Sequence, residues 1–174
     1  MKRKFTFCVF LLITLASCKM VDVYHYVNLD TENARVSLQW SKPNPSVPKE
    51  IDLVEGVLLV PDFYQFWPGY SSSAYLYVIT DQEIELVIKS ITIEAPDTKE
   101  ELIVPLKLLT TTKRSKSSLS FSRDRILDLK SSNKFKEAKA LIVTIEWRRS
   151  SDLISNRSVY ELERISNTDI AWAT

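Results

Sequence analysis

Polar and apolar residues alternate along several short stretches of the chain, the pattern of β-strands with one buried face. The clearest stretch is 139–149, where an apolar residue at every second position predicts a central strand. Its apolar positions are Leu141, Val143, Ile145 and Trp147. The same alternation predicts strands within 21–27, 36–40 and 74–79, one or two strands within 83–94, and a closing strand within 158–165. The wholly apolar run 57–60 and the stretch 102–109 are also expected to be strands.

Turn residues separate these stretches at short intervals, and only 124–129 is expected to form a helical turn. Pro61 is expected to end its strand, and Pro105 inside 102–109 indicates an edge strand or a bulge. We therefore predict an all-β fold, an antiparallel β-sandwich that is immunoglobulin-like in broad architecture. A small β-barrel is the alternative. Trp40 and Trp147 are expected in the core because each ends a clean apolar alternation.

The N-terminus has the pattern of a secretory signal peptide. Lys2, Arg3 and Lys4 precede an apolar run at 5–15. The run is shorter than the roughly 20 residues that a membrane-spanning helix needs. A basic start, a short apolar run and small residues together are typical of a cleaved leader.

The end of this run, Leu15-Ala16-Ser17-Cys18, resembles the lipobox of bacterial lipoprotein precursors. The resemblance implies that residues 1–17 are a signal peptide and that Cys18 becomes the lipidated first residue. It also implies fatty acyl chains such as palmitate, which anchor the protein in a membrane. Lys19 stands where an Asp resembles an inner-membrane retention signal, so we expect the outer membrane, facing the periplasm. Residues 18–21 would then be a short tether that holds a single domain, 22–174, against the headgroups.

Composition limits the partners and the covalent chemistry. The formal net charge of +1, which falls when the basic leader is removed, is not that of a nucleic-acid-binding protein. Cys8 would leave with the leader and Cys18 would be acylated, so no intramolecular disulfide is expected.

The residues of common catalytic sites are scarce. A Ser-His-Asp or Cys-His site would depend on the single histidine, His25, which lies in the valine register of strand 21–27. Zinc needs three or four N or S ligands, which this chain cannot supply without relying on carboxylates. The sequence also has no glycine-rich phosphate loop. A pair of carboxylates for glycan cleavage stays open among the 22 acidic residues. We predict no enzymatic activity, no metal and no cofactor.

Two segments are candidate binding surfaces. The aromatic segment 63–70 contains Pro68-Gly69, which suits the centre of a type II turn. It either exposes an aromatic binding loop or caps the core, and we favour the cap. The stretch 110–125 is rich in basic and hydroxyl residues and either contacts lipid phosphates or acidic partners or simply connects two strands; we favour the connection. The candidate binding residues are Tyr64, Phe66, Trp67, Tyr70, Lys113, Arg114 and Lys116.

These observations predict an envelope lipoprotein that acts as a non-enzymatic interaction or assembly subunit for an envelope protein partner. In plan it is similar to the short, β-rich lipoprotein subunit of the type VI secretion apparatus, although no sequence motif supports that analogy. The alternative is a lipid- or glycan-binding module that uses the aromatic segment 63–70.

Overall fold

The computed structural model describes residues 18–31, 53, 56–66, 74–105, 107–113, 119–127, 134–135 and 137–172. This part of the chain forms ten strands, all paired antiparallel, and it contains no α-helix. The strands are β1 (Cys18–Val27), β2 (Val57–Phe66), β3 (Ala74–Thr80), β4 (Glu85–Ala95), β5 (Glu100–Val104), β6 (Lys107–Thr110), β7 (Thr112–Lys113), β8 (Ser120–Leu127), β9 (Ala140–Arg149) and β10 (Asn156–Trp172). The predicted all-β antiparallel fold is confirmed.

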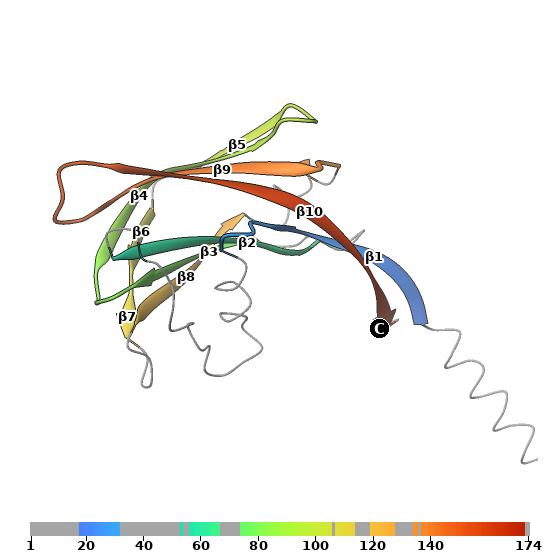
Figure 1. Ribbon diagram of the computed structural model, residues 1–174, viewed down its shortest axis with the longest axis horizontal. Helices are drawn as coiled ribbons and strands as arrows, with labels where there is room; N and C mark the ends of the chain where they lie inside the picture. The colour runs from blue at the N-terminus through green and yellow to red at the C-terminus, as the bar shows by residue number, and fades with distance from the viewer. Residues whose placement is uncertain are drawn as a thin grey trace, which may run out of the picture.

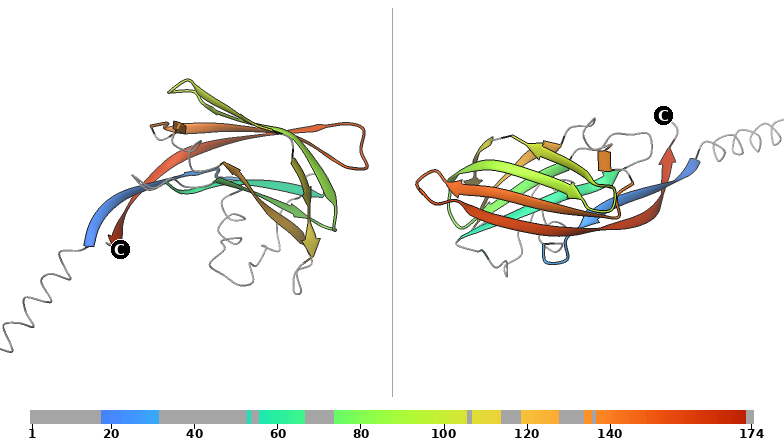
Figure 2. Two further views of the ribbon diagram at one scale, coloured as in Figure 1. Left: turned by 180° about the vertical axis from the view of Figure 1, so that it is seen from behind. Right: turned by 90° about the horizontal axis from the view of Figure 1, so that it is seen from above.

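The strands form one sheet in the order β5-β4-β9-β10-β1-β2-β3-β8-β7, with β6 pairing β4 beside β5. The sheet curls into a half-barrel, so that β4, β9 and β10 lie over β2, β3 and β8 (Figure 1). The view from behind shows the same two layers (Figure 2). This curled sheet agrees with both the sandwich and the small-barrel descriptions.

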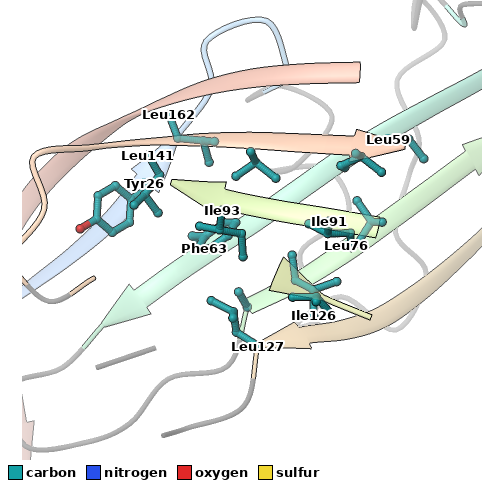
Figure 3. Close-up of a cluster of buried hydrophobic side chains, with 14 of the residues drawn as sticks. Tyr26, Leu59, Phe63, Leu76, Ile91, Ile93, Ile126, Leu127, Leu141 and Leu162 are labelled. Atoms are coloured by element: carbon teal, nitrogen blue, oxygen red, sulfur yellow. The ribbon is translucent and has the colours of Figure 1, made fainter. Parts of the chain in front are cut away.

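The hydrophobic core fills the space inside the curl (Figure 3). One layer contributes the inward side chains of β4, β9 and β10, among them Ile93 and Leu141. The other layer contributes those of β2, β3 and β8, among them Phe63 and Leu76. Because each strand presents alternate residues to this space, the period-2 pattern of the sequence becomes one continuous core.

Strand β9 lies between β4 and β10, as expected for a central strand. The alternate apolar residues predicted to face inward, from Leu141 to Trp147, are all buried. Trp147 Nε1 donates a hydrogen bond to Ser158 Oγ over 3.0 Å, which satisfies the polar atom of the buried indole. Trp40, the second tryptophan predicted to be buried, lies outside the described residues.

The stretch 83–94 is one strand with a bulge. Its buried residues occupy even positions at Leu86 and Ile88 and odd positions at Ile91 and Ile93. The pairing of β4 with β9 shifts register between Ile88 and Ser90. The extra residue in the bulge therefore keeps both apolar sets on the inner face.

Two local predictions were wrong and one was confirmed. Pro61 was expected to end its strand, but β2 runs through it. At Pro61 the recorded pairs join β2 to β3 alone, because the β1–β2 pairs involve only Phe63 and Phe66. A proline is tolerated where one side of a strand has no ladder partner. The expected helical turn at 124–129 is extended as far as Leu127, within β8. Pro105 separates β5 from β6, and both pair with the same strand, as its edge or bulge role predicted.

The two ends of the described chain form a ribbon beyond the body of the sheet (Figures 1 and 2). Cys18 pairs with Trp172 at the far end of this ribbon. Strand β10 pairs with β9 only as far as Glu163, and the recorded pairs of β1 with β2 begin at Tyr24. Residues 18–21 are therefore part of β1 rather than a separate tether. Six paired residues extend about 20 Å, which places the body of the sheet away from Cys18.

Candidate functional site

A groove of about 440 Å³ opens on the outer face of the sheet, beside the C-terminal end of β1 at Val27. It is lined by residues 27–30, Pro96, 140–142 and 161–163. The half-buried side chain of Ile142 lies on this outer face, because its neighbours Leu141 and Val143 point into the core. The volume of the groove falls within the range of roughly 300–1,000 Å³ that is usual for ligand pockets.

One wall of the groove is the turn that follows β1. Asn28 Nδ2 donates a hydrogen bond to the Glu161 carbonyl over 2.9 Å, which ties the turn to β10. Thr31 N lies 3.1 Å from Asn28 Oδ1 and 3.2 Å from the Asn28 carbonyl, so the turn is also closed on itself. These bonds hold Leu29, which is 75% exposed, at the groove. An asparagine that bonds its own backbone two or three residues on is the usual device for such a turn.

The outer face beside the groove is acidic. Strand pairing places Glu101 opposite Glu94, Glu94 opposite Ile142, and Ile142 opposite Glu161. The three glutamates are exposed, as are Asp30 and Glu163 at the groove. Like charges directly opposite each other on a sheet are destabilising. The Glu94–Glu101 pair therefore weakens the fold slightly while it raises the affinity of this face for cations.

The lining offers aliphatic surface and carboxylates, with no histidine, thiol, hydroxyl or lysine side chain. Such a lining suits a ligand that carries positive charge beside an apolar group. Within the described ranges, no cluster of His, Cys, Asp and Glu could hold a metal ion. The same described residues contain no helix long and apolar enough to cross a membrane.

The predicted aromatic segment 63–70 is only partly described by the structure: positions 63–66 belong to β2, and positions 67–70 lie outside the described residues. Phe63 is fully buried in the core, and positions 64–66 continue β2. The segment is therefore not a loop from its first residue. Tyr64 and Phe66 are placed by their backbone alone, and Trp67, Pro68, Gly69 and Tyr70 lie outside the described residues. The burial of Phe63 agrees with the core-capping alternative for this position.

The predicted basic segment starts at the far end of β3 from the aromatic segment. Lys113, placed by its backbone in β7, pairs with Ser120, which pairs with Thr80 at the end of β3. The aromatic segment instead follows Asp62, which pairs with Tyr75 near the start of β3. Five residues of strand separate these two points by about 17 Å. Arg114 and Lys116 lie outside the described residues.

Two further arginines from this basic stretch lie on β8, where they contact aromatic rings. The Arg123 guanidinium lies 3.6 Å from the centroid of the Tyr75 ring and 5.6 Å from that of Tyr77. Arg125 lies 6.0 Å from the Tyr75 ring. These cation–π contacts cover an outer-face apolar cluster that includes Val60 and Tyr77. Their role is to cover this second, smaller core.

His25 is half-buried on the outer side of β1, opposite Ile165 of β10. It is not among the groove-lining residues. The face opposite His25 carries Tyr24 and Tyr26, which enter the main core, whereas Val23 and Val27 are buried on the histidine side. The strand is thus covered on both faces, which the valine alternation alone did not indicate.

The groove was missed by sequence reasoning because its residues come from four distant segments. Single signals were present, such as outward glutamates within strands 83–94 and 158–165. Only strand pairing brings them together. Comparison with known proteins adds no relative, since no protein-family model, curated protein or solved structure matches the chain.

Proposed function

We propose that this protein is a lipid-anchored envelope lipoprotein that acts as a non-enzymatic interaction subunit, and that the acidic groove binds its protein partner. The observation that carries the interaction role is the groove itself, with Ile142 and Leu29 as apolar surface and Asp30, Glu161 and Glu163 as acidic groups. The partner that suits it is a protein segment with an aliphatic side chain next to Lys or Arg. Charge complementarity of this kind supplies specificity and a faster association rate.

The anchor is supported by the lipobox resemblance of Leu15-Ala16-Ser17-Cys18. Strand β1 begins at Cys18, the residue that the resemblance makes the mature N-terminus. An anchor there would hold the protein at the membrane through the β1–β10 ribbon. The outer membrane, facing the periplasm, remains our proposed location on the basis of Lys19.

The interaction role can be tested with a defined probe, a short peptide of alternating Lys and Leu, with the same peptide carrying Glu for Lys as its control. We expect the basic peptide to bind and the acidic peptide not to bind, as measured by isothermal titration calorimetry. Glu161→Lys should weaken binding at least about tenfold. Glu146→Lys makes the same charge change at an exposed position of β9 that does not line the groove, and should change binding little. Equal loss in both variants would show that general surface charge, not the groove, binds the peptide.

A further inference from the structure

The ribbon formed by β1 and β10 brings the two ends of the described chain together. Strand pairing places Trp172 opposite Cys18 and Ile170 opposite Met20. Figures 1 and 2 show the C-terminal end of β10 beside the start of β1, away from the body of the sheet. The Cα atoms of directly opposite residues in an antiparallel pair lie about 4.5–5.5 Å apart. The backbone therefore holds Trp172 next to the residue that would carry the acyl chains.

One face of this ribbon end is apolar by register. Residues two apart along a strand share a face, and so do residues directly opposite each other. The register thus assigns four apolar positions to one face: Cys18, Met20, Ile170 and Trp172. Met20 is 72% exposed. The next pair on this face, Asp22 and Thr168, is polar and exposed, with Thr168 Oγ1 3.4 Å from Asp22 Oδ1. The apolar positions are therefore confined to the end that carries Cys18.

Among the described strands, this ribbon end pairs with no third strand. The β1–β2 pairs begin at Tyr24, and the β10–β9 pairs stop at Glu163. A two-stranded ribbon alone is only marginally stable in water. Its apolar face gains free energy when it is removed from water. The position of Cys18 supplies the partner that would cover this face, which is the bilayer that holds the acyl chains.

The dimensions of a bilayer match the length of the apolar face. Each headgroup layer is roughly 5–8 Å thick, which is half the difference between the whole bilayer and its hydrocarbon core. Acyl chains on Cys18 would hold this residue at the inner boundary of that layer. In an upright ribbon, Met20 then lies about 7 Å from the boundary, and Asp22 lies about 13 Å from it, outside the headgroups. Tryptophan is enriched at the headgroup level because its ring is amphipathic.

We propose that the apolar end of the β1–β10 ribbon is a second membrane-binding element, in which Met20, Ile170 and Trp172 contact the headgroup layer beside the Cys18 anchor. This inference rests on the proposed lipid anchor and deepens it, because it names residues of the folded chain that bind the same membrane. It also positions the acidic groove. Val27 lines the groove and lies at most about 30 Å along β1 from Cys18, so an upright ribbon holds the groove that far from the bilayer.

The test uses the full chain as cells produce it, reconstituted into vesicles of phosphatidylethanolamine and phosphatidylglycerol. Part of the lipid carries bromine on the acyl chains close to the headgroups, which quenches the fluorescence of nearby tryptophans. Wild-type emission should be quenched, and Trp172→Phe should lose this quenching. Because the chain has four tryptophans, a matched control is needed. Trp147→Phe removes a tryptophan that is buried in the body of the sheet, and the quenched fraction should not fall in this variant.

A charge on the apolar face should move the ribbon end out of the headgroup layer. Met20→Glu should reduce the quenching of Trp172, because a carboxylate is costly to transfer from water to a less polar environment. Ile165→Glu is the matched control for the added charge. Ile165 is 41% exposed and lies about 23 Å along the ribbon from Trp172, beyond the headgroups, so this variant should be quenched like the wild type.

Mass spectrometry of the same samples reports separately whether Cys18 is acylated. Acylated protein whose quenching does not depend on Trp172 would overturn the ribbon proposal and leave the anchor intact. Protein without acyl chains would contradict the proposed anchor. Quenching that depends on Trp172 in such a sample would still support the ribbon end as a membrane-binding element, and its absence there would overturn both proposals.

Discussion

Lys107 of β6 and Asp124 of β8 form an ion pair, with Lys107 Nζ 2.6 Å from Asp124 Oδ2. The same ammonium group donates a hydrogen bond to the carbonyl of Arg125. Strand β6 pairs with β4, whereas β8 pairs with β3 and β7 in the other layer. The contact therefore joins the two layers across the open side of the half-barrel, where no ladder of backbone hydrogen bonds connects them among the recorded strand pairs.

We predict a coupling energy of about 1 kcal/mol between Lys107 and Asp124, because both side chains keep about a third of their surface in water. It should be measured by urea denaturation of Lys107→Ala, Asp124→Ala and the double variant. The coupling should shrink as salt is added. Lys99→Ala, at an exposed turn residue, serves as a control for loss of a lysine. A coupling energy near zero would mean that packing alone keeps the two layers together.

Tyr26→Phe should lower the free energy of unfolding by about 1–3 kcal/mol, the cost of leaving a buried polar group short of its partner. The Tyr26 hydroxyl lies 2.7 Å from the Phe135 carbonyl and 2.8 Å from the Ala138 carbonyl, and its one proton serves both. The matched control is Tyr75→Phe at a half-buried tyrosine, where the ring contact with Arg123 is kept. Equal stability of Tyr26→Phe and the parent in urea would show that the hydroxyl does not stabilise this part of the core.

Stability should decline in strong alkali because the folded protein retains phenol protons that the unfolded chain releases. Burial raises the pKa of Tyr160 to about 12, and it also raises the pKa of Tyr24 and of Tyr26. The unfolded chain binds fewer protons above pH ~10, so this stabilisation is complete below that pH and is lost as the pH rises towards 12. Urea midpoints at increasing pH measure the loss, and phenolate absorbance should show these tyrosines ionising only as the protein unfolds. Tyr160→Phe should reduce the pH dependence, and an unchanged slope in that variant would contradict the assignment.

Cys18→Ala should abolish the incorporation of labelled palmitate and leave the leader uncleaved, if Leu15-Ala16-Ser17-Cys18 directs lipidation. Radiolabelling of cells that express the full chain, followed by mass spectrometry of the product, measures both effects. Cys8→Ala is the matched control, since Cys8 lies inside the proposed leader and should not affect acylation. Normal acylation of the Cys18→Ala chain would remove the anchor from the proposed function and leave the groove proposal unaffected.

Local alternation was enough to identify most of the described strands. The buried residues of β9 follow directly from the sequence, because a strand with one face in the core shows its burial as period 2. Within 83–94 the apolar residues change from even-numbered to odd-numbered positions, which is the sequence signature of the bulge in β4. Pro105 likewise marked the break between two edge strands, because proline lacks the N–H that a central strand needs.

Which strand pairs with which was decided only by the tertiary structure. Strand β1 lies between β10 and β2, so the burial of Tyr24 and Tyr26 depends on neighbours far away in the sequence. The same is true of Pro61, which is tolerated because of where the β1–β2 pairing stops. The groove is the extreme case, since its lining comes from four segments between residues 27 and 163. A strand's own residues set which side chains share a face, but the pairing register, determined by packing of the whole core, sets which faces become neighbours.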